Sequence, residues 1–278
     1  MEIITAEIID AFAQHLRNRE LAPGTIENYM RHVRAFIAYL DGLVPTKELV
    51  AEWREYLLTN HTAETVNGML VSLNCFFHFI GREDCVVKLL RVQHKAYRDE
   101  SRELTQEEYW RLLDAANRTG KERLALMMET ICGIGLRVSE LRYITVEAAR
   151  AREAEISMKG KVRRIILPGK LAKKLLKYAK KNKITSGPIF ITASGKPLSR
   201  RQIWAEMKRL CKAAGVGASK VFPHNLRHLF AQAFYRASHD IAHLADVLGH
   251  SSIDTTRIYL ISTGDEHRRQ IEALGLVV

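Results

Sequence analysis

One short segment in the second half of the sequence combines residue types that act on phosphate esters. The stretch PHNLRH at 223–228 places an imidazole and a guanidinium three residues apart. A proline favours a helix start there, and residues three apart share a helix face, so His224 and Arg227 point the same way. An imidazole can move a proton while a guanidinium neutralises a pentacoordinate phosphorus centre. The segment therefore predicts phosphoryl-transfer chemistry.

Three further polar residues lie in apolar settings. Arg137 stands between leucine and valine in the segment GLRVSEL, and Glu140 follows one turn later, where it can orient the guanidinium. A structural ion pair explains this segment equally well. His250 follows a glycine that ends a predicted helix, and Tyr259 lies nine residues beyond it. Each signal is weak alone, because a single tyrosine on a helix is usually a core or surface residue.

A hairpin and several helices are predicted to carry these residues. Two strands at 154–158 and 162–167 flank a turn that contains Lys159 and Lys161. The segment TQEE, which begins at Thr105, is a capping box that opens a helix. Other elements are predicted as helices at 122–131, after residues 168–169, and from about 199, 223, 240 and 253, with a lone strand at 189–191.

The first ninety residues have the pattern of a helical bundle. Thr25 is predicted to cap one helix, and Thr62 to begin another that ends near Gly81. A charged stretch without periodicity follows, which is typical of an interdomain linker. The predicted organisation is a helical domain at 1–90, a linker at 91–103 and a second domain at 104–278 with a C-terminal tail at 264–278.

Charge is divided unevenly along the chain. The first 100 residues carry 11 Lys and Arg against 14 Asp and Glu, whereas the rest of the chain carries 32 against 17. No acidic residue lies between Glu155 and Glu206. A field of one sign over such a span favours a polyanion, most often nucleic acid. The basic segment Lys170–Lys183 is predicted either to follow DNA phosphates or to form a solvated face.

Composition excludes several classes of protein. Of the 278 residues, 47% are hydrophobic and 27% are charged, as in a folded globular protein. No apolar run is long enough to cross a bilayer and the N-terminus lacks a basic leader, so we expect a cytoplasmic protein without a membrane partner. The four cysteines form no CxxC pair and are expected to be reduced core residues.

Taken together, these segments resemble the tyrosine recombinases, the family of phage integrases and Xer-like enzymes. The resemblance rests on five pieces in one order: GLRVSEL, the hairpin lysine, HNLRH, LGH and the tyrosine that follows. The N-terminal half is also similar to the family's core-binding domain. The resemblance implies a mainly α fold with a small β-hairpin or sheet, in which a helical core-binding domain precedes a mixed α+β catalytic domain.

The resemblance also implies a role for each residue. Tyr259 would be the nucleophile that forms a 3′-phosphotyrosine link with DNA. Arg137 and Arg227 would hold the non-bridging oxygens of the scissile phosphate in a bidentate geometry that lysine cannot copy. His250 would donate a further hydrogen bond to the phosphate, and His224 would act in proton transfer with the tyrosine. A phenol is a poor nucleophile until cationic neighbours favour its phenolate, which agrees with these roles.

The hairpin lysine would be the general acid. Lys159 is assigned to protonate the departing 5′ oxygen, although Xer-type relatives often have a glycine on each side of this lysine and here Met158 precedes it. Lys161 is therefore an alternative acid. No metal or other cofactor is expected, because arginines, a lysine and imidazoles supply the positive charge, and a phosphotyrosine link conserves the bond energy without ATP.

The implied partner is a specific site on double-stranded DNA, embraced by the two domains as a clamp. Four protomers would form a homotetramer on two paired sites and exchange strands through a Holliday junction, for integration, excision or dimer resolution. Apolar residues such as Ile271 and Leu274 gather in the tail. The tail is expected to dock into a neighbouring protomer, with packing on its own domain as the alternative.

Three other functions explain parts of the pattern. His224 and His228 have the spacing of zinc ligands, but no glutamate base lies between them and Arg227 would repel a dication on the same face. A DNA-binding module without chemistry explains the charge but not the set of arginines, histidines and tyrosine. A type IB topoisomerase shares the chemistry, and it would relax any supercoiled plasmid rather than exchange strands at one site.

Overall fold

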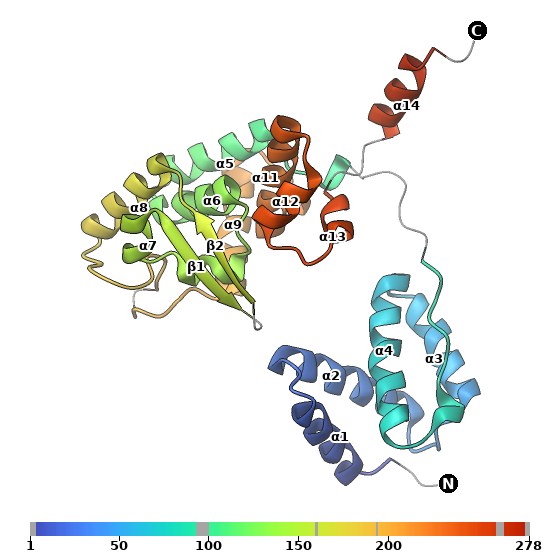
Figure 1. The fold of residues 1–278 in the computed structure, drawn as a ribbon. Coiled ribbons are helices and arrows are strands. Elements are labelled where there is room, and N and C mark those ends of the chain that lie inside the picture. Colours follow the sequence, from blue (N-terminus) through green and yellow to red (C-terminus); the bar gives the residue numbers. More distant parts are fainter. Residues whose placement is uncertain (1–3, 93–99, 159–160, 193, 260–263, 276–278) are drawn as a thin grey trace. The chain divides into compact units, whose positions relative to one another are not determined.

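The computed structural model describes residues 4–92, 100–158, 161–192, 194–259 and 264–275 (Figure 1). The chain divides into two compact units, Met1–His94 and Lys95–Val278. Most described elements are helices, and the only sheet within these ranges has two strands and lies in the second unit. Among the described helices, none combines the length and the apolar character that a bilayer-spanning segment requires.

Four helices build the first unit, namely α1 (Ala6–Asn18), α2 (Pro23–Leu40), α3 (Lys47–Leu58) and α4 (Ala63–Phe79), and the 3-10 turn η1 (Glu83–Cys85) follows them. Each helix turns an apolar face toward one core, which is rich in aromatic side chains. Phe36 lies edge-on to Trp53 and to Phe77, with ring centroids 5.1 and 5.9 Å apart. Edge-to-face pairs of this kind add to the stabilisation from burial alone.

The helix starts of the first unit follow local capping chemistry. Helix α4 begins directly after Thr62, at its predicted start, and Thr62 caps it because its side chain accepts a hydrogen bond from the N–H of Thr65 at 3.4 Å. The predicted cap at Thr25 is wrong, since α2 begins at Pro23. Proline presets the helical φ and lacks the N–H that a capping side chain would satisfy, so the helix starts there instead.

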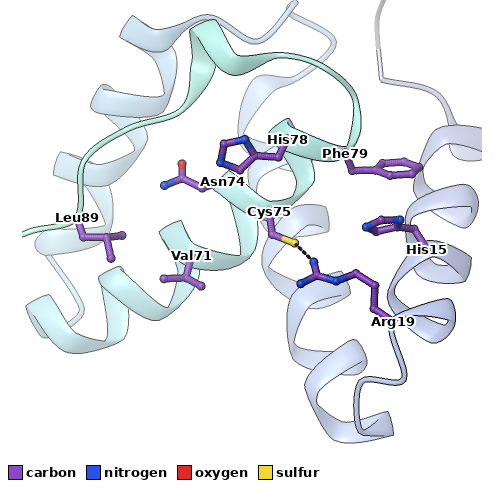
Figure 2. A pocket seen from close by; sticks show the side chains of 8 residues that line it. All are labelled: His15, Arg19, Val71, Asn74, Cys75, His78, Phe79 and Leu89. Carbon is purple, nitrogen blue, oxygen red and sulfur yellow. Dashed lines mark hydrogen bonds between the residues drawn. The ribbon is translucent and has the colours of Figure 1, made fainter.

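A hollow of about 470 Å³ opens on the first unit between α1, α4 and the segment after η1 (Figure 2). The rings of His15 and Phe79 line it with centroids 4.9 Å apart, and the Arg19 guanidinium donates to the Cys75 sulfur at 3.6 Å. None of the residues predicted to do chemistry lies in this hollow. The candidate site must therefore lie in the second unit.

The second unit is built around α6. In chain order its elements are η2 (Glu100–Arg102), α5 (Gln106–Arg118), α6 (Glu122–Ile134), η3 (Val138–Tyr143), α7 (Val146–Ala151), β1 (Glu153–Met158), β2 (Lys161–Ile166), α8 (Gly169–Lys181), α9 (Arg200–Lys208), α10 (Cys211–Ala214), η4 (Ala218–Lys220), α11 (Pro223–Ser238), α12 (Ile241–Leu248), α13 (Ile253–Arg257) and α14 (Gly264–Ala273). Helices α5, α8 and α11 all pack against α6 (Figure 1), and most residues of α6 are buried.

The basic helix α8 is partly neutralised within its own unit. Its apolar side, which includes Leu175, is buried in the core. On its other side Lys174 and Lys181 pair with Glu129 and Glu122 of α6, each at 2.5 Å. These partners leave fewer lysines of α8 available to an external anion than the sequence alone implies.

The hairpin places alternate residues on the core face. Strands β1 and β2 are antiparallel, with Ala154 opposite Ile165 and Ile156 opposite Arg163. Ala154, Ile156 and Ile165 are buried, so Arg163 lies on the same face as this apolar set. Lys159 lies outside the described residues. The predicted strand at 189–191 is wrong, because only isolated bridges form there and neighbouring prolines offer no N–H to a ladder.

Candidate active site

Five of the six predicted site residues come together in the second unit, from segments far apart in the sequence. Arg137 precedes η3, His224 and Arg227 lie on the first turns of α11, His250 follows α12, and Tyr259 follows α13. Helix α12 packs against both α11 and α13, which brings the last three segments side by side (Figure 1). The sixth, Lys159, lies outside the described residues, as does its neighbour Gly160.

Arg227 is the buried centre of the site, with only 2% of its surface exposed. Its Nη1 donates to the carbonyl of Gly135 at 2.6 Å, and its Nη2 donates to the carbonyl of Leu248 at 2.9 Å. These carbonyls belong to the C-terminal ends of α6 and α12, where backbone acceptors lack helical partners and the helix dipole is negative. Two helix ends therefore hold the guanidinium in place.

Burial and the nearby Arg137 lower the pKa of Arg227, while the neighbouring Tyr259 acts in the opposite direction. The group stays protonated, since an arginine starts from a very high value. A buried guanidinium beside the tyrosine hydroxyl is a permanent positive charge at the point where a phenolate would form.

Arg137 is the more open of the two arginines, with 41% of its side chain exposed. Its Nη1 donates to Oε1 of Glu140 at 3.0 Å, and its Nη2 reaches the carbonyl of Gly249 at 3.4 Å. The Glu140 carboxylate is only 2% exposed and also accepts from the Arg137 backbone N–H at 2.8 Å. Glu140 thus orients Arg137, which is the arrangement that its spacing in the sequence indicates.

His250 links Arg227 to α13. Its Nε2 lies 2.9 Å from the Arg227 Nη2, and its Nδ1 lies 2.8 Å from the hydroxyl of Thr256. An arginine can only donate, so Nε2 accepts and the ring proton is on Nδ1, where it is shared with the threonine. Burial and the neighbouring arginines lower the pKa of His250 to about 4. The imidazole is therefore neutral at pH 7 in the free protein.

Tyr259 is 2% exposed and packs against Ala231, Leu244 and Leu248. Its ring is stacked on that of His250, with centroids 5.7 Å apart and planes 12° apart. The ring of His228 meets it edge-on at 4.3 Å. The rings of His250 and His228 therefore hold the phenol ring from two sides.

His224 completes the group beside the tyrosine. Its ring centroid lies 5.9 Å from that of Tyr259 and 4.7 Å from that of His228. Burial lowers the pKa of His224, and the positive charges of Arg227 and Arg137 lower it further. A neutral imidazole at this place can accept a proton from a neighbouring hydroxyl.

A cleft of about 1010 Å³ opens over these residues. Arg137, His224, Arg227 and Tyr259 line it. Four further cationic side chains line it as well, those of Arg102, Arg200, Arg201 and Lys208, while no acidic side chain is among the described residues that line it. A cationic cleft with a tyrosine in its lining suits a phosphodiester of a polyanion.

Three residues of the site were not found from the sequence. Thr256, with no exposed surface, holds His250, and His228 contacts the tyrosine ring, although its spacing from His224 indicated only a zinc site. Arg163 is the third, because its Nη2 donates to Oε2 of Glu140 at 2.6 Å. Within the described ranges, no group of three or more His, Cys, Asp or Glu side chains is placed to hold a metal ion.

Comparison with known proteins agrees with this geometry. Residues 102–265 match the model of the phage integrase family, and residues 9–84 match the N-terminal SAM-like domain of phage integrases. The chain is 30% identical to tyrosine recombinase XerC of Halalkalibacterium halodurans, over 96% of this chain and 97% of the relative. It is 26% identical to tyrosine recombinase XerA of Pyrococcus furiosus, over 99% and 96% of the two chains.

Solved structures share the fold. The XerH site-specific recombinase bound to its palindromic difH substrate aligns over 96% of this chain and 83% of its own, with a TM-score of 0.74 at 19% identity. The Tn1549 transposon integrase in complex with transposon right end DNA aligns over 96% and 99%, with a TM-score of 0.73 at 18% identity. The chain therefore belongs to the phage integrase family, and it is a tyrosine recombinase, an enzyme that cleaves and rejoins DNA strands.

Proposed function

We propose that this protein is a site-specific DNA recombinase that works through a covalent link between Tyr259 and a DNA 3′ phosphate. The observation that carries the proposal is the convergence of Tyr259, Arg137, Arg227 and His224 in the lining of one cationic cleft, with His250 in contact with Arg227 and stacked on Tyr259. The Tyr259 oxygen attacks the scissile phosphorus, and the bond from phosphorus to the 5′ oxygen breaks. The 5′ hydroxyl of a second strand later attacks the phosphotyrosine and releases the tyrosine.

The geometry supports a division of labour among the side chains. Arg227 is fixed and buried, so it serves as a preorganised cation for the transition state, while the more open Arg137 receives a non-bridging oxygen from the cleft. His224 is held neutral beside Tyr259 and takes the phenol proton. Lys159 donates a proton to the leaving 5′ oxygen, and Lys161 is the alternative.

His250 changes its role when DNA binds. In the free protein its Nε2 accepts from Arg227, so it offers no proton there. A phosphate that takes over the Arg227 donor brings negative charge next to the imidazole and favours its protonated form. His250 then donates to the phosphate, as the family resemblance implies.

The partner that we propose is a defined site on duplex DNA, bound by a helical clamp domain at 1–90 and a catalytic domain at 104–278, joined by a linker at 91–103. Four protomers assemble on two sites and exchange strands through a Holliday junction. The tail favours assembly, because Ile271 on α14 and Leu274 directly after it are 53% and 63% exposed and so have apolar surface available to a second protomer.

A nicked suicide substrate tests the proposal. After cleavage, the short fragment that carries the 5′ hydroxyl diffuses away, so the covalent intermediate cannot religate and accumulates. It appears on a denaturing gel as a band of reduced mobility. Tyr259→Phe is expected to bind the DNA but to form no adduct, because only the nucleophilic oxygen is removed. Tyr235→Phe, on α11 outside the cleft, is the matched control and should form the adduct at the wild-type rate. An adduct in Tyr259→Phe would refute the assignment.

A further inference from the structure

A cluster of three charges runs from Arg137, which lines the cleft, to two side chains in the interior behind it, and the proposed mechanism uses only Arg137. Glu140 is 2% exposed and stands between two guanidiniums. Its Oε1 accepts from Arg137 at 3.0 Å, and its Oε2 accepts from Arg163 at 2.6 Å. We call Arg137, Glu140 and Arg163 the arginine–carboxylate cluster.

Arg163 lies mostly inside the protein and does not line the cleft. Its side chain is 16% exposed, and it donates to the carbonyl of Val247 through Nη1 at 2.8 Å. Its Nε is buried without a hydrogen-bond partner. An unsatisfied buried donor destabilises the folded state, so a guanidinium at this position needs an explanation. The Arg163 chain also lies directly against Gly249, where an added Cβ would come within 2.5 Å of its Cδ.

We propose that Arg163 is a positioning residue for Arg137: it neutralises the buried Glu140 carboxylate, so that the Arg137 guanidinium remains free to bind the scissile phosphate. This inference rests on the proposed function, in which Arg137 holds a phosphate oxygen. It adds a residue that touches neither DNA nor Tyr259.

The net charge of the cluster determines how tightly Arg137 is held, because Glu140 lies where water barely reaches. With both arginines present the cluster has a net charge of plus one, and its surplus lies on the more exposed member, Arg137. Without Arg163 the net charge is zero, and Glu140 has only Arg137 as its cation. A buried carboxylate attracts its single partner strongly because the local dielectric is low. Arg137 would then be held as a counter-ion and would bind the phosphate less well.

The position of Arg163 also joins three parts of the site. It lies on β2, two residues beyond Lys161 and therefore close to the hairpin tip that carries the proposed acid. Its contact with Glu140 reaches η3, and its contacts with Val247 and Gly249 reach the turn before His250. The side chain of Arg163 thus fixes β2, Glu140 and the turn before His250 relative to one another.

A double-variant cycle tests the inference with single-turnover cleavage at saturating DNA. Arg163→Leu is expected to cleave about 10- to 100-fold more slowly, the range for loss of one charge-assisted hydrogen bond to the phosphate. Adding Glu140→Gln removes the competing carboxylate while an amide oxygen can still accept from Arg137, so most of the lost rate should return. Arg163→Lys keeps the charge and should retain more activity than Arg163→Leu. Arg164→Leu on the same strand is the matched control, because Arg164 is 73% exposed, and it should cleave normally.

A substrate with a methylphosphonate at the scissile position separates positioning from general damage to the fold. This substrate lacks the oxygen charge that Arg137 neutralises, so the gap between wild type and Arg163→Leu should shrink on it. A gap of equal size on both substrates would overturn the inference, as would a double variant no faster than Arg163→Leu. If Arg163→Leu alone does not fold, the charge-balanced double variant decides, and a loss of more than about tenfold in its rate counts against the inference. Absence of any wild-type adduct at Tyr259 would instead refute the proposed function.

Discussion

Gly249 offers a sharp test of how the turn before His250 is built. Its φ of +63° lies in the left-handed region, and a Cβ there would lie 2.5 Å from Cδ and 3.0 Å from Nε of Arg163. Gly249→Ala therefore adds two costs. The left-handed conformation costs an alanine about 1–2 kcal/mol, and displacing Arg163 weakens its bond to buried Glu140, worth about 1.5–3 kcal/mol for a hydrogen bond to a charged group.

Together these costs predict that Gly249→Ala destabilises the second unit by about 3–5 kcal/mol. For a unit of this size, each kcal/mol lowers the melting temperature by about 2–4 °C, so we expect a fall of roughly 10 °C in differential scanning calorimetry. Gly120→Ala is the matched control, since Gly120 has a φ of +69° but open space where the Cβ would lie. It should show only the backbone cost. Equal melting temperatures for the two variants would refute the steric reasoning.

Three further predictions concern the acid, the histidines and the tail. Lys159→Ala should cleave ordinary DNA slowly and recover on a bridging 5′-sulfur substrate, whose leaving group needs little protonation; rescue of Lys161→Ala instead would move the acid to that residue. Because the folded pKa values of His224 and His250 lie below the usual 6.5, the unfolded chain binds more protons, so calorimetry should show stability falling as pH drops from about 6.5 toward 5. The loss of stability with falling pH should be smaller in His250→Asn. An unchanged loss would contradict the statement that the lowered pKa of His250 contributes to it. Deleting residues 271–278 should spare half-site binding but weaken assembly on paired sites in analytical ultracentrifugation, and normal recombination would exclude the tail as an intersubunit contact.

Most helices could be predicted because their signals are local. Thr105 forms a full capping box with Glu108, and Pro223 begins α11, as the sequence indicates. Local signals also failed in two places. At the start of α2, a threonine suited to cap a helix lies two residues after a proline suited to the first helical position. The helix begins at Pro23 and not after Thr25. At 189–191 an apolar run resembles a strand, but a strand needs a partner, and partners are set by tertiary packing.

The residues of the candidate site could be named from their order in the sequence, whereas the residues that support them could not. Arg163 and Arg164 are adjacent cations of one strand, yet one is 16% and the other 73% exposed. Residues along β2 alternate between the inward and the outward face. This alternation could have identified Arg163 as an inward residue, because Ile165 points into the core and Arg163 is two residues away on the same face. Thr256 had no such signal, since Thr255 beside it has the same side chain and only the turn of α13 decides which faces His250.

The anchoring of Arg227 to main-chain carbonyls has a consequence for protein engineering. A guanidinium held by side chains would move whenever a mutation changed those side chains. Here the carbonyls of Gly135 and Leu248 come with the ends of two helices, and any sequence that keeps those ends in place keeps the anchor. Libraries that vary other residues of the cleft to retarget DNA recognition can therefore leave Arg227 anchored, provided that the two glycine turns at 135 and 249 are excluded from variation.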